Sequence, residues 1–117
     1  MPKASRDKGN RREREARQLL HDMGINARRT YSMQAAAGGS ADLITENVVG
    51  QIAWEIKGCE TLALTSWLRQ LDRQREFHAS ASNILAFKQS RRPFMYMGFL
   101  DQLPSTIKVL NPFIADA

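Results

Sequence analysis

Residues 51–58 (QIAWEIKG) show a clear alternation of apolar and polar positions. Ile52, Trp54 and Ile56 recur at every second residue, as in a strand whose successive side chains point to opposite faces. This pattern predicts that the three apolar side chains pack on a core. Glu55 and Lys57 then share the other face, where a carboxylate and an ammonium group side by side call for an explanation.

Two segments have apolar residues at helical spacing. Residues 8–23 carry an apolar stripe, and Gly24 follows at a position where a helix commonly ends. Residues 65–79 predict a second helix in the same way. The side chains expected to be buried are Ala16, Leu19, Leu20 and Met23 in the first helix, and Trp67, Leu68, Leu71 and Phe77 in the second.

Four more short segments complete a predicted five-stranded sheet: residues 25–31, 41–45, 84–88 and 94–99. The short turn between 41–45 and 51–58 favours an antiparallel hairpin. The strand, helix, strand succession that ends with 84–88 favours a parallel crossover. The pattern therefore predicts an α+β fold with a mixed sheet, in the order helix, three strands, helix, two strands.

The ends of the chain are less regular. Residues 1–7 have no periodicity and are expected to form a flexible basic arm, which leaves 8–117 as a single domain. Residues 32–40 are small and glycine-containing, which predicts a flexible loop. The tail from residue 101 contains two prolines, and its pattern leaves open a short helix or a strand.

Composition narrows the class of protein. The 117 residues are 43% hydrophobic and 25% charged, as in an ordinary globular domain. Seventeen Lys and Arg against 12 Asp and Glu give a net charge of +5, a weak signal for a nucleic-acid partner. Cys59 is the only cysteine, which excludes an internal disulfide. No apolar run approaches the roughly 20 residues of a spanning helix, so we expect a cytoplasmic protein without membrane contact.

The candidate chemistry lies around residues 51–58. Asp42, in the preceding strand, can approach Glu55 and Lys57 across the hairpin. Two carboxylates, with water and a phosphate oxygen, suit a hard divalent cation such as Mg²⁺. A neighbouring lysine can offset charge that develops on phosphate oxygens. The alternative is a solvated surface strand, because an E-x-K triplet also occurs by chance.

Several motifs lie in a recognisable order. They are Lys8-Gly9, Glu13-Arg14-Glu15, Gly24, Arg28-Arg29, Ser40, Asp42 and Glu55-Ile56-Lys57, followed by ILAFK at 84–88. This order resembles the PD-(D/E)xK nuclease superfamily, and in particular the small Holliday-junction resolvases of archaea and phages. The similarity extends over about residues 8–88. Two departures are Ala41, where the motif has proline, and a long segment before Asp42.

The resemblance implies a restriction-endonuclease-like core, an α/β/α sandwich, and a role for each matching residue. Asp42, Glu55, the Ile56 carbonyl and Glu13 would hold Mg²⁺, for which Mn²⁺ would substitute, and Lys57 would be the catalytic lysine. Without the resemblance, Glu13 would be expected only to pair with Arg17 four residues on. The residues expected to contact DNA are Lys8, Arg11, Arg14, Arg28, Arg29 and Ser40.

The function that follows is a Mg²⁺-dependent endonuclease that resolves four-way DNA junctions. The alternatives are a flap, nick or restriction-like nuclease of the same superfamily, or a non-catalytic DNA-binding protein on this fold. The two-fold symmetry of a junction predicts a homodimer, because a chain this short carries one site. The sequence leaves open whether the host is cellular or viral. The expected interface is the apolar tail: Val109, Leu110, Phe113 and Ile114.

Other residues have simpler explanations. Gln70 and Gln74 could reach the site, but solvated helix glutamines are the favoured interpretation. His21 and His78 lie far apart in sequence, near predicted helix ends, and a catalytic role is not favoured for either. Trp54 and Trp67 are expected in the core. Arg91 and Arg92, at a predicted turn, are equally compatible with phosphate contact and with solvent.

Overall fold

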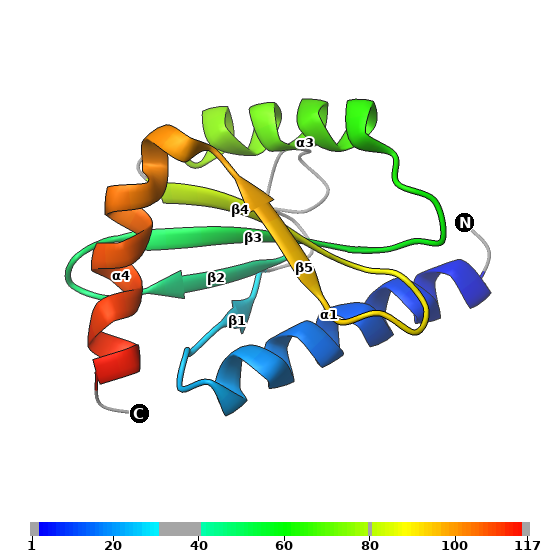
Figure 1. The fold of residues 1–117 in the computed structure, drawn as a ribbon, viewed down its shortest axis with the longest axis horizontal. Helices are drawn as coiled ribbons and strands as arrows, with labels where there is room; N and C mark the ends of the chain where they lie inside the picture. The colour runs from blue at the N-terminus through cyan, green and yellow to red at the C-terminus, as the bar shows by residue number, and fades with distance from the viewer. Residues whose placement is uncertain (1–2, 31–40, 80, 116–117) are drawn as a thin grey trace.

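The computed structural model describes residues 3–30, 41–79 and 81–115, with side chains from Gly9 onward (Figure 1). The helices are α1 (Lys3–Asp22), α3 (Leu64–Phe77) and α4 (Leu103–Ala115), and a short 3-10 turn, η1 (Leu100–Gln102), precedes α4. The strands are β1 (Arg28–Arg29), β2 (Leu43–Glu46), β3 (Gln51–Gly58), β4 (Ala81–Lys88) and β5 (Met95–Gly98). None of these helices is long and apolar enough to cross a membrane.

The five strands form one mixed sheet in the order β1-β2-β3-β4-β5. β2 and β3 form the antiparallel hairpin expected from the sequence. Asn47 closes the turn, because its Oδ1 accepts the backbone N–H groups of Val49 and Gly50. β3 and β4 are parallel over eight residues and are joined through α3, which confirms the expected crossover. The α+β fold class is therefore confirmed.

The helices cover the two faces of the sheet (Figure 1). α1 and α4 pack on the face that carries Ile52, Trp54 and Ile56, as the alternation predicted. α3 packs on the opposite face through Trp67 and Leu71. Both tryptophans are in the core, as expected. Glu55 and Lys57 therefore share a face with the strand residues beneath α3.

Three details of the helices differ from the expectation. α1 begins at Lys3, so the helix includes residues 3–7, which we had expected to form a flexible arm. Leu19 and Met23 are 43% and 47% exposed, because no element of the described chain covers that side of α1. Leu68 and Phe77, expected to be buried, are also about half exposed.

The C-terminal tail forms the 13-residue helix α4. Pro104 lies in its first turn, where the missing N–H costs nothing, whereas Pro112 lies inside the helix. Val109 packs in the core and its carbonyl accepts the side-chain amide of Asn47 at 2.9 Å. This contact joins the end of the β2–β3 hairpin to α4.

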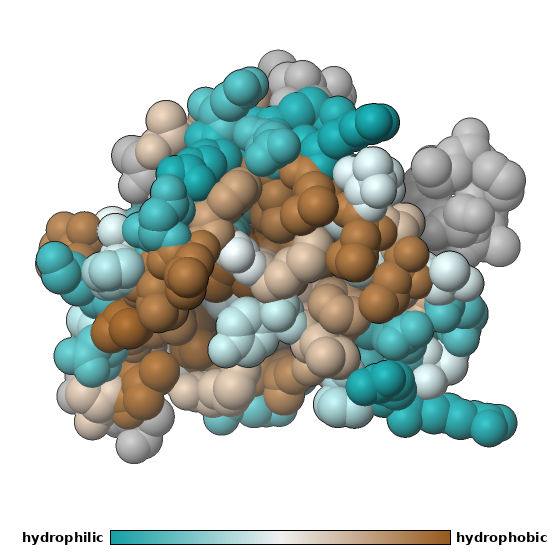
Figure 2. Space-filling view, turned by 45° about the horizontal axis from the view of Figure 1, so that its top comes forward, coloured by the Kyte–Doolittle hydropathy of each residue, from teal (hydrophilic) through white to brown (hydrophobic). Residues whose placement is uncertain are grey.

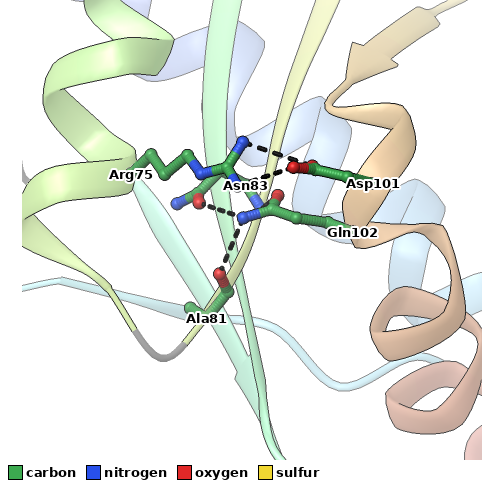
Figure 3. Close-up of polar contacts among 5 residues, drawn as sticks. All are labelled: Arg75, Ala81, Asn83, Asp101 and Gln102. Atoms are coloured by element: carbon green, nitrogen blue, oxygen red, sulfur yellow. Dashed lines mark hydrogen bonds and ion pairs between the residues drawn. The ribbon is translucent and has the colours of Figure 1, made fainter.

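A polar network anchors the start of this tail to the sheet (Figure 3). Gln102 donates to Asn83 Oδ1 at 3.0 Å, and its own Oε1 accepts the Asn83 backbone N–H at 2.8 Å. Arg75 of α3 forms two hydrogen bonds with Asp101, at 2.8 and 3.2 Å. The turn η1 is thereby tied to both β4 and α3.

Candidate active site

The candidate site forms where β3 continues beyond its pairing with β2. The register pairs Leu43 with Trp54, and β3 then continues to Gly58 with β4 as its one strand partner among the described residues. Within the described residues, no strand pairs with this edge of β3 from Glu55 onward. Asp42 is the residue just before β2 and lies at the corner where the two strands separate.

Asp42 occupies this corner through two hydrogen bonds to β3. Its backbone N–H donates to the Trp54 carbonyl at 2.9 Å. Its side-chain Oδ2 accepts the Ile56 backbone N–H at 2.8 Å. The carboxylate thus takes the place of the next ladder partner and is held in a fixed position between Glu55 and Lys57.

Glu55 and Lys57 lie next to this carboxylate. Lys57 Nζ is 3.5 Å from Glu55 Oε1, and the side chains of the two residues are only 24% and 15% exposed. Burial, followed by repulsion from Asp42, raises the pKa of Glu55 to about 7, although the lysine opposes the shift. Burial also raises the pKa of Asp42, against the hydrogen bond from Ile56 and the charge of Lys57. The positive charge of Lys57 therefore does not offset the cost of burying the two ionised carboxylates at this corner.

Glu13 reaches the same corner from α1. Its side chain is 13% exposed, and Arg29 of β1 forms an ion pair with it at 2.6 Å. Burial and then the charge of Asp42 raise the pKa of Glu13, while Arg29 and Arg17 oppose the shift. Glu13 also contributes to the raised pKa of Glu55. Three carboxylates and one amine from separate parts of the chain therefore share one electrostatic environment.

The donor groups at this corner suit a hard cation. Asp42 and Glu55 supply carboxylate oxygens, and the Ile56 carbonyl points to the same side of the strand as the N–H that Asp42 accepts. Oxygen donors of this kind suit hard divalent cations. Among the described side chains, no group of three or more His, Cys, Asp or Glu is already clustered as metal ligands. Glu13 and Glu55 instead face Arg29 and Lys57, so a cation would have to compete with these ion pairs.

Only some of the residues expected to contact DNA lie near the carboxylates. Arg14 is exposed on α1 beside Glu13, and Arg29 adjoins the site through Glu13. Arg11 pairs with Glu15 at 3.4 Å, and Arg28 pairs with Glu46 at the opposite end of β2. Arg28 therefore points away from the carboxylates. The side chain of Lys8 and the whole of Ser40 lie outside the described residues.

Three residues near the site, Gln74, His78 and Arg12, have contacts that the favoured interpretation of the sequence did not predict, although Gln74 had been considered as a residue that could reach the site. Gln74 is 1% exposed, and its amide donates to the Ala53 carbonyl of β3 at 2.9 Å, so it is not a solvated glutamine. His78 accepts the backbone N–H of Ala41, next to Asp42. Arg12 is 8% exposed and packs against Gly58, the residue after Lys57. The available signal for Gln74 was its position on the same helix face as Leu71, one turn away, and Trp67, two turns away. The sequence held no such signal for His78 or Arg12.

Comparisons with known proteins bear on the fold. No family model matches the chain, and no curated protein sequence matches it. Among solved structures it is similar to Hjc, a Holliday junction resolvase from the archaeal hyperthermophile Archaeoglobus fulgidus. The TM-score is 0.57 at 22% identity, over 75% of this chain and 73% of that one. A second structure, that of SSO0001, gives a TM-score of 0.42 at 20% identity, over 66% of this chain and 40% of the other. The resemblance in the sequence to small archaeal resolvases is thus matched by a structural neighbour of that kind, and the chain has the restriction-endonuclease-like fold.

Proposed function

We propose that this protein is a metal-dependent endonuclease that cuts branched DNA, with the four-way junction as its substrate. The observation that carries the proposal is the corner at which Asp42 and Glu55 meet Lys57, where β3 continues beyond its pairing with β2. A solvated surface strand, the alternative raised by the sequence, would not have three partly buried charges there. The likeness to Hjc, described as a Holliday junction resolvase, supports the choice of substrate.

We propose that Asp42, Glu55 and the Ile56 carbonyl hold Mg²⁺, with Glu13 joining them if it releases Arg29. A bound divalent cation supplies positive charge at the scissile phosphate and lowers the pKa of a water molecule. Lys57, 3.5 Å from Glu55 Oε1, is placed to donate hydrogen bonds to phosphate oxygens as their charge grows. The Ile56 N–H keeps Asp42 oriented while this happens.

Arginines near the corner would bind the DNA backbone. Arg14 is exposed and adjoins Glu13 on α1, and the Arg29 side chain is 56% exposed while it pairs with Glu13. A guanidinium group is well suited to phosphate because its planar donors match two oxygens. Arg28, which pairs with Glu46, is less well placed for this role than the sequence suggested.

A homodimer is part of the proposal, because a four-way junction has two-fold symmetry and needs two matched cuts. A groove of about 450 Å³ lies between α1 and α4, over the sheet residues Trp54, Ile56 and Ile84. None of the side chains that line it is charged. Figure 2 shows apolar side chains gathered on the side of the molecule that carries β5 and α4, below the polar surface of α3.

The exposed residues of α4 support a second copy as the occupant of this groove. Leu103, Ile107 and Ile114 are 49%, 56% and 54% exposed, and with Leu110 they form a stripe at alternating spacings of four and three residues. Such a stripe is typical of a helix that packs against another helix. Val109, which we had expected in the interface, is 2% exposed and belongs to the core. Sedimentation should give a dimer at micromolar concentration, and Ile107→Glu should give a monomer.

The test of the activity compares labelled four-way junction, fork, flap and linear duplex, each with Mg²⁺, with Mn²⁺ and with EDTA. We expect paired, symmetric nicks in the junction alone, and no cleavage in EDTA. Glu55→Ala and Lys57→Ala should each abolish cleavage but leave junction binding intact. Glu76→Ala, which removes an exposed carboxylate from α3, is the matched control and should cut normally.

Each other outcome points to a different function. Cleavage of flaps or linear duplex instead of junctions would support another nuclease of the superfamily. Junction binding without cleavage in either metal would indicate a non-catalytic DNA-binding protein. Cleavage that survives Glu55→Ala and Lys57→Ala would remove this corner from consideration as the active site.

A further inference from the structure

Ala41, the residue before Asp42, is completely buried and has both backbone polar groups taken by side chains. Its N–H donates to His78 Nε2 at 3.3 Å. Its carbonyl accepts the Thr30 hydroxyl at 2.6 Å. A buried backbone group needs such partners, because an unpaired one has lost its hydrogen bond to water without replacement.

The two side chains come from different elements. His78 follows the last residue of α3, and its own N–H donates to the Gln74 carbonyl at 2.8 Å. Thr30 follows β1, and its N–H donates to the Asp42 carbonyl at 3.2 Å. The start of β2 is thus fixed from α3 on one side and from β1 on the other. Asp42 follows immediately, with its carboxylate on the Ile56 N–H.

We propose that His78 and Thr30 are positioning residues for Asp42: by holding Ala41 at both its N–H and its carbonyl, they fix the backbone from which the Asp42 carboxylate reaches β3. This inference rests on the proposed nuclease function. It also accounts for Ala41 itself. The motif has proline at this position, which has no N–H and a fixed φ. With alanine the N–H must be satisfied and φ is free, and the two side chains meet both needs.

The hydrogen bond from Ala41 determines the protonation state and tautomer of His78. A nitrogen that accepts an N–H carries no proton, so the imidazole is neutral with its hydrogen on Nδ1. Thr30 must donate rather than accept, because its partner is a carbonyl. These requirements define conservative replacements. Glutamine at 78 retains an acceptor oxygen at similar reach, and serine at 30 retains the hydroxyl.

The first test measures junction cleavage by His78→Leu and Thr30→Val. Each should lower kcat by about 10- to 100-fold, the usual effect of removing a partner that orients a metal ligand. KM for the junction should stay within about twofold, because neither side chain is among the proposed DNA contacts. His78→Gln and Thr30→Ser should restore most of kcat. Glu76→Ala, which changes an exposed side chain two residues before His78, is the control at the end of α3 and should leave kcat unchanged.

The second test needs neither metal nor activity. Amide hydrogen exchange in the metal-free protein should be faster at Ala41 and at Ile56 in His78→Leu than in the wild type. Amides in the β3–β4 ladder serve as internal controls and should be unchanged. If the wild type does not cleave any DNA, the nuclease proposal fails, yet this measurement still decides whether the two residues position Asp42. Uniform acceleration of exchange across β3, or full kcat in both His78→Leu and Thr30→Val, would overturn the inference.

Discussion

The Asp42 carboxylate accepts the backbone N–H of Ile56 at 2.8 Å, in the position where β2 would otherwise have continued along β3. This hydrogen bond holds the negative charge of Asp42 beside Glu55 and Lys57. It does so without requiring a direct contact between the side chains of Asp42 and Glu55. The N–H favours the ionised form of Asp42, but burial outweighs it and the pKa of Asp42 is raised. The structural role and the electrostatic cost of Asp42 can therefore be separated by mutation.

Asp42→Asn should separate the structural role of Asp42 from the effect of its charge. The asparagine carbonyl oxygen can still accept the Ile56 N–H, so the corner should keep its shape while it loses its charge. We expect kcat on junction DNA to fall by more than about 100-fold, with binding unchanged within about twofold. Asp72→Asn, an exposed residue of α3, is the matched control. Cleavage by Asp42→Asn within a few-fold of the wild type would exclude a metal-binding role for this carboxylate.

Glu55 should make the stability of the metal-free protein depend on pH. Its pKa is about 7 in the folded protein, because of burial first and of Asp42 second, against an ordinary value of 4.5. The folded state therefore binds more protons than the unfolded state between about pH 4.5 and pH 7. The free energy of unfolding should fall as pH rises through this window, by at most about 1.4 kcal/mol per pH unit for one proton.

The measurement is urea denaturation in EDTA at several pH values, for the wild type and for Glu55→Gln. The raised pKa of Asp42 and of Glu13 acts in the same direction as that of Glu55, whereas burial lowers the pKa of His78 and acts in the opposite direction. The difference between wild type and variant reports the titration of Glu55 together with its coupling to Asp42 and Glu13. That difference should shrink above pH 7 when Mg²⁺ is added, since a cation would favour the ionised carboxylate. A pH-independent difference would show that Glu55 titrates normally.

The sequence predicted the strand pattern and the central motif because both depend on local periodicity. The two-residue alternation at Ile52, Trp54 and Ile56 required Glu55 and Lys57 to share a face, and the short turn after Glu46 required β2 to pair with β3. The sequence left open whether the tail forms a short helix or a strand, because proline is usually a helix breaker; Pro104, however, lies in the first turn of α4, where it is tolerated.

Burial was predicted less well than secondary structure, because it depends on which elements meet. Leu19 and Met23 continue the apolar stripe of α1 but border the uncovered groove, whereas the polar Gln74 is buried against β3. His78 contacts Ala41 across 37 residues of sequence, and no local pattern marks such a contact. No local pattern marks the ion pair between Arg28 and Glu46 either, and this pair directs Arg28 away from the surface predicted to bind DNA.

Arg14 and Arg28 should differ in how they affect DNA binding. Arg14 is exposed and follows Glu13 in α1, whereas Arg28 is engaged with Glu46 at 3.2 Å. Each phosphate contact releases counterions, so its loss reduces the slope of log affinity against log salt concentration by about 1. We expect that reduction for Arg14→Ala on junction DNA and little change for Arg28→Ala. Equal slopes for the two variants would place the DNA elsewhere on the surface.

Gly58 should tolerate no side chain while Arg12 is present. A Cβ added at Gly58 would lie 2.7 Å from Arg12 Cγ, and Arg12 is largely buried between α1 and the end of β3. Gly58→Ala should therefore push α1 away from β3 at a cost of about 1–3 kcal/mol of unfolding free energy. Because α1 carries Glu13, cleavage should weaken as well.

A double mutant distinguishes this steric effect from a general loss of stability. Arg12→Ala removes the clashing atoms, so Gly58→Ala should cost much less in the Arg12→Ala background than in the wild type. Gly9→Ala, on the helix that carries Arg12, is the control: a Cβ at Gly9 meets nothing within 4 Å. This change should raise the free energy of unfolding by about 0.5–1 kcal/mol. Additive effects of Gly58→Ala and Arg12→Ala, measured by urea denaturation, would mean that the close approach of α1 to β3 does not depend on this glycine. A coupling energy of more than about 0.5 kcal/mol between Gly58→Ala and Arg12→Ala would instead show that Gly58 sets the distance between α1 and β3, and with it the position of Glu13.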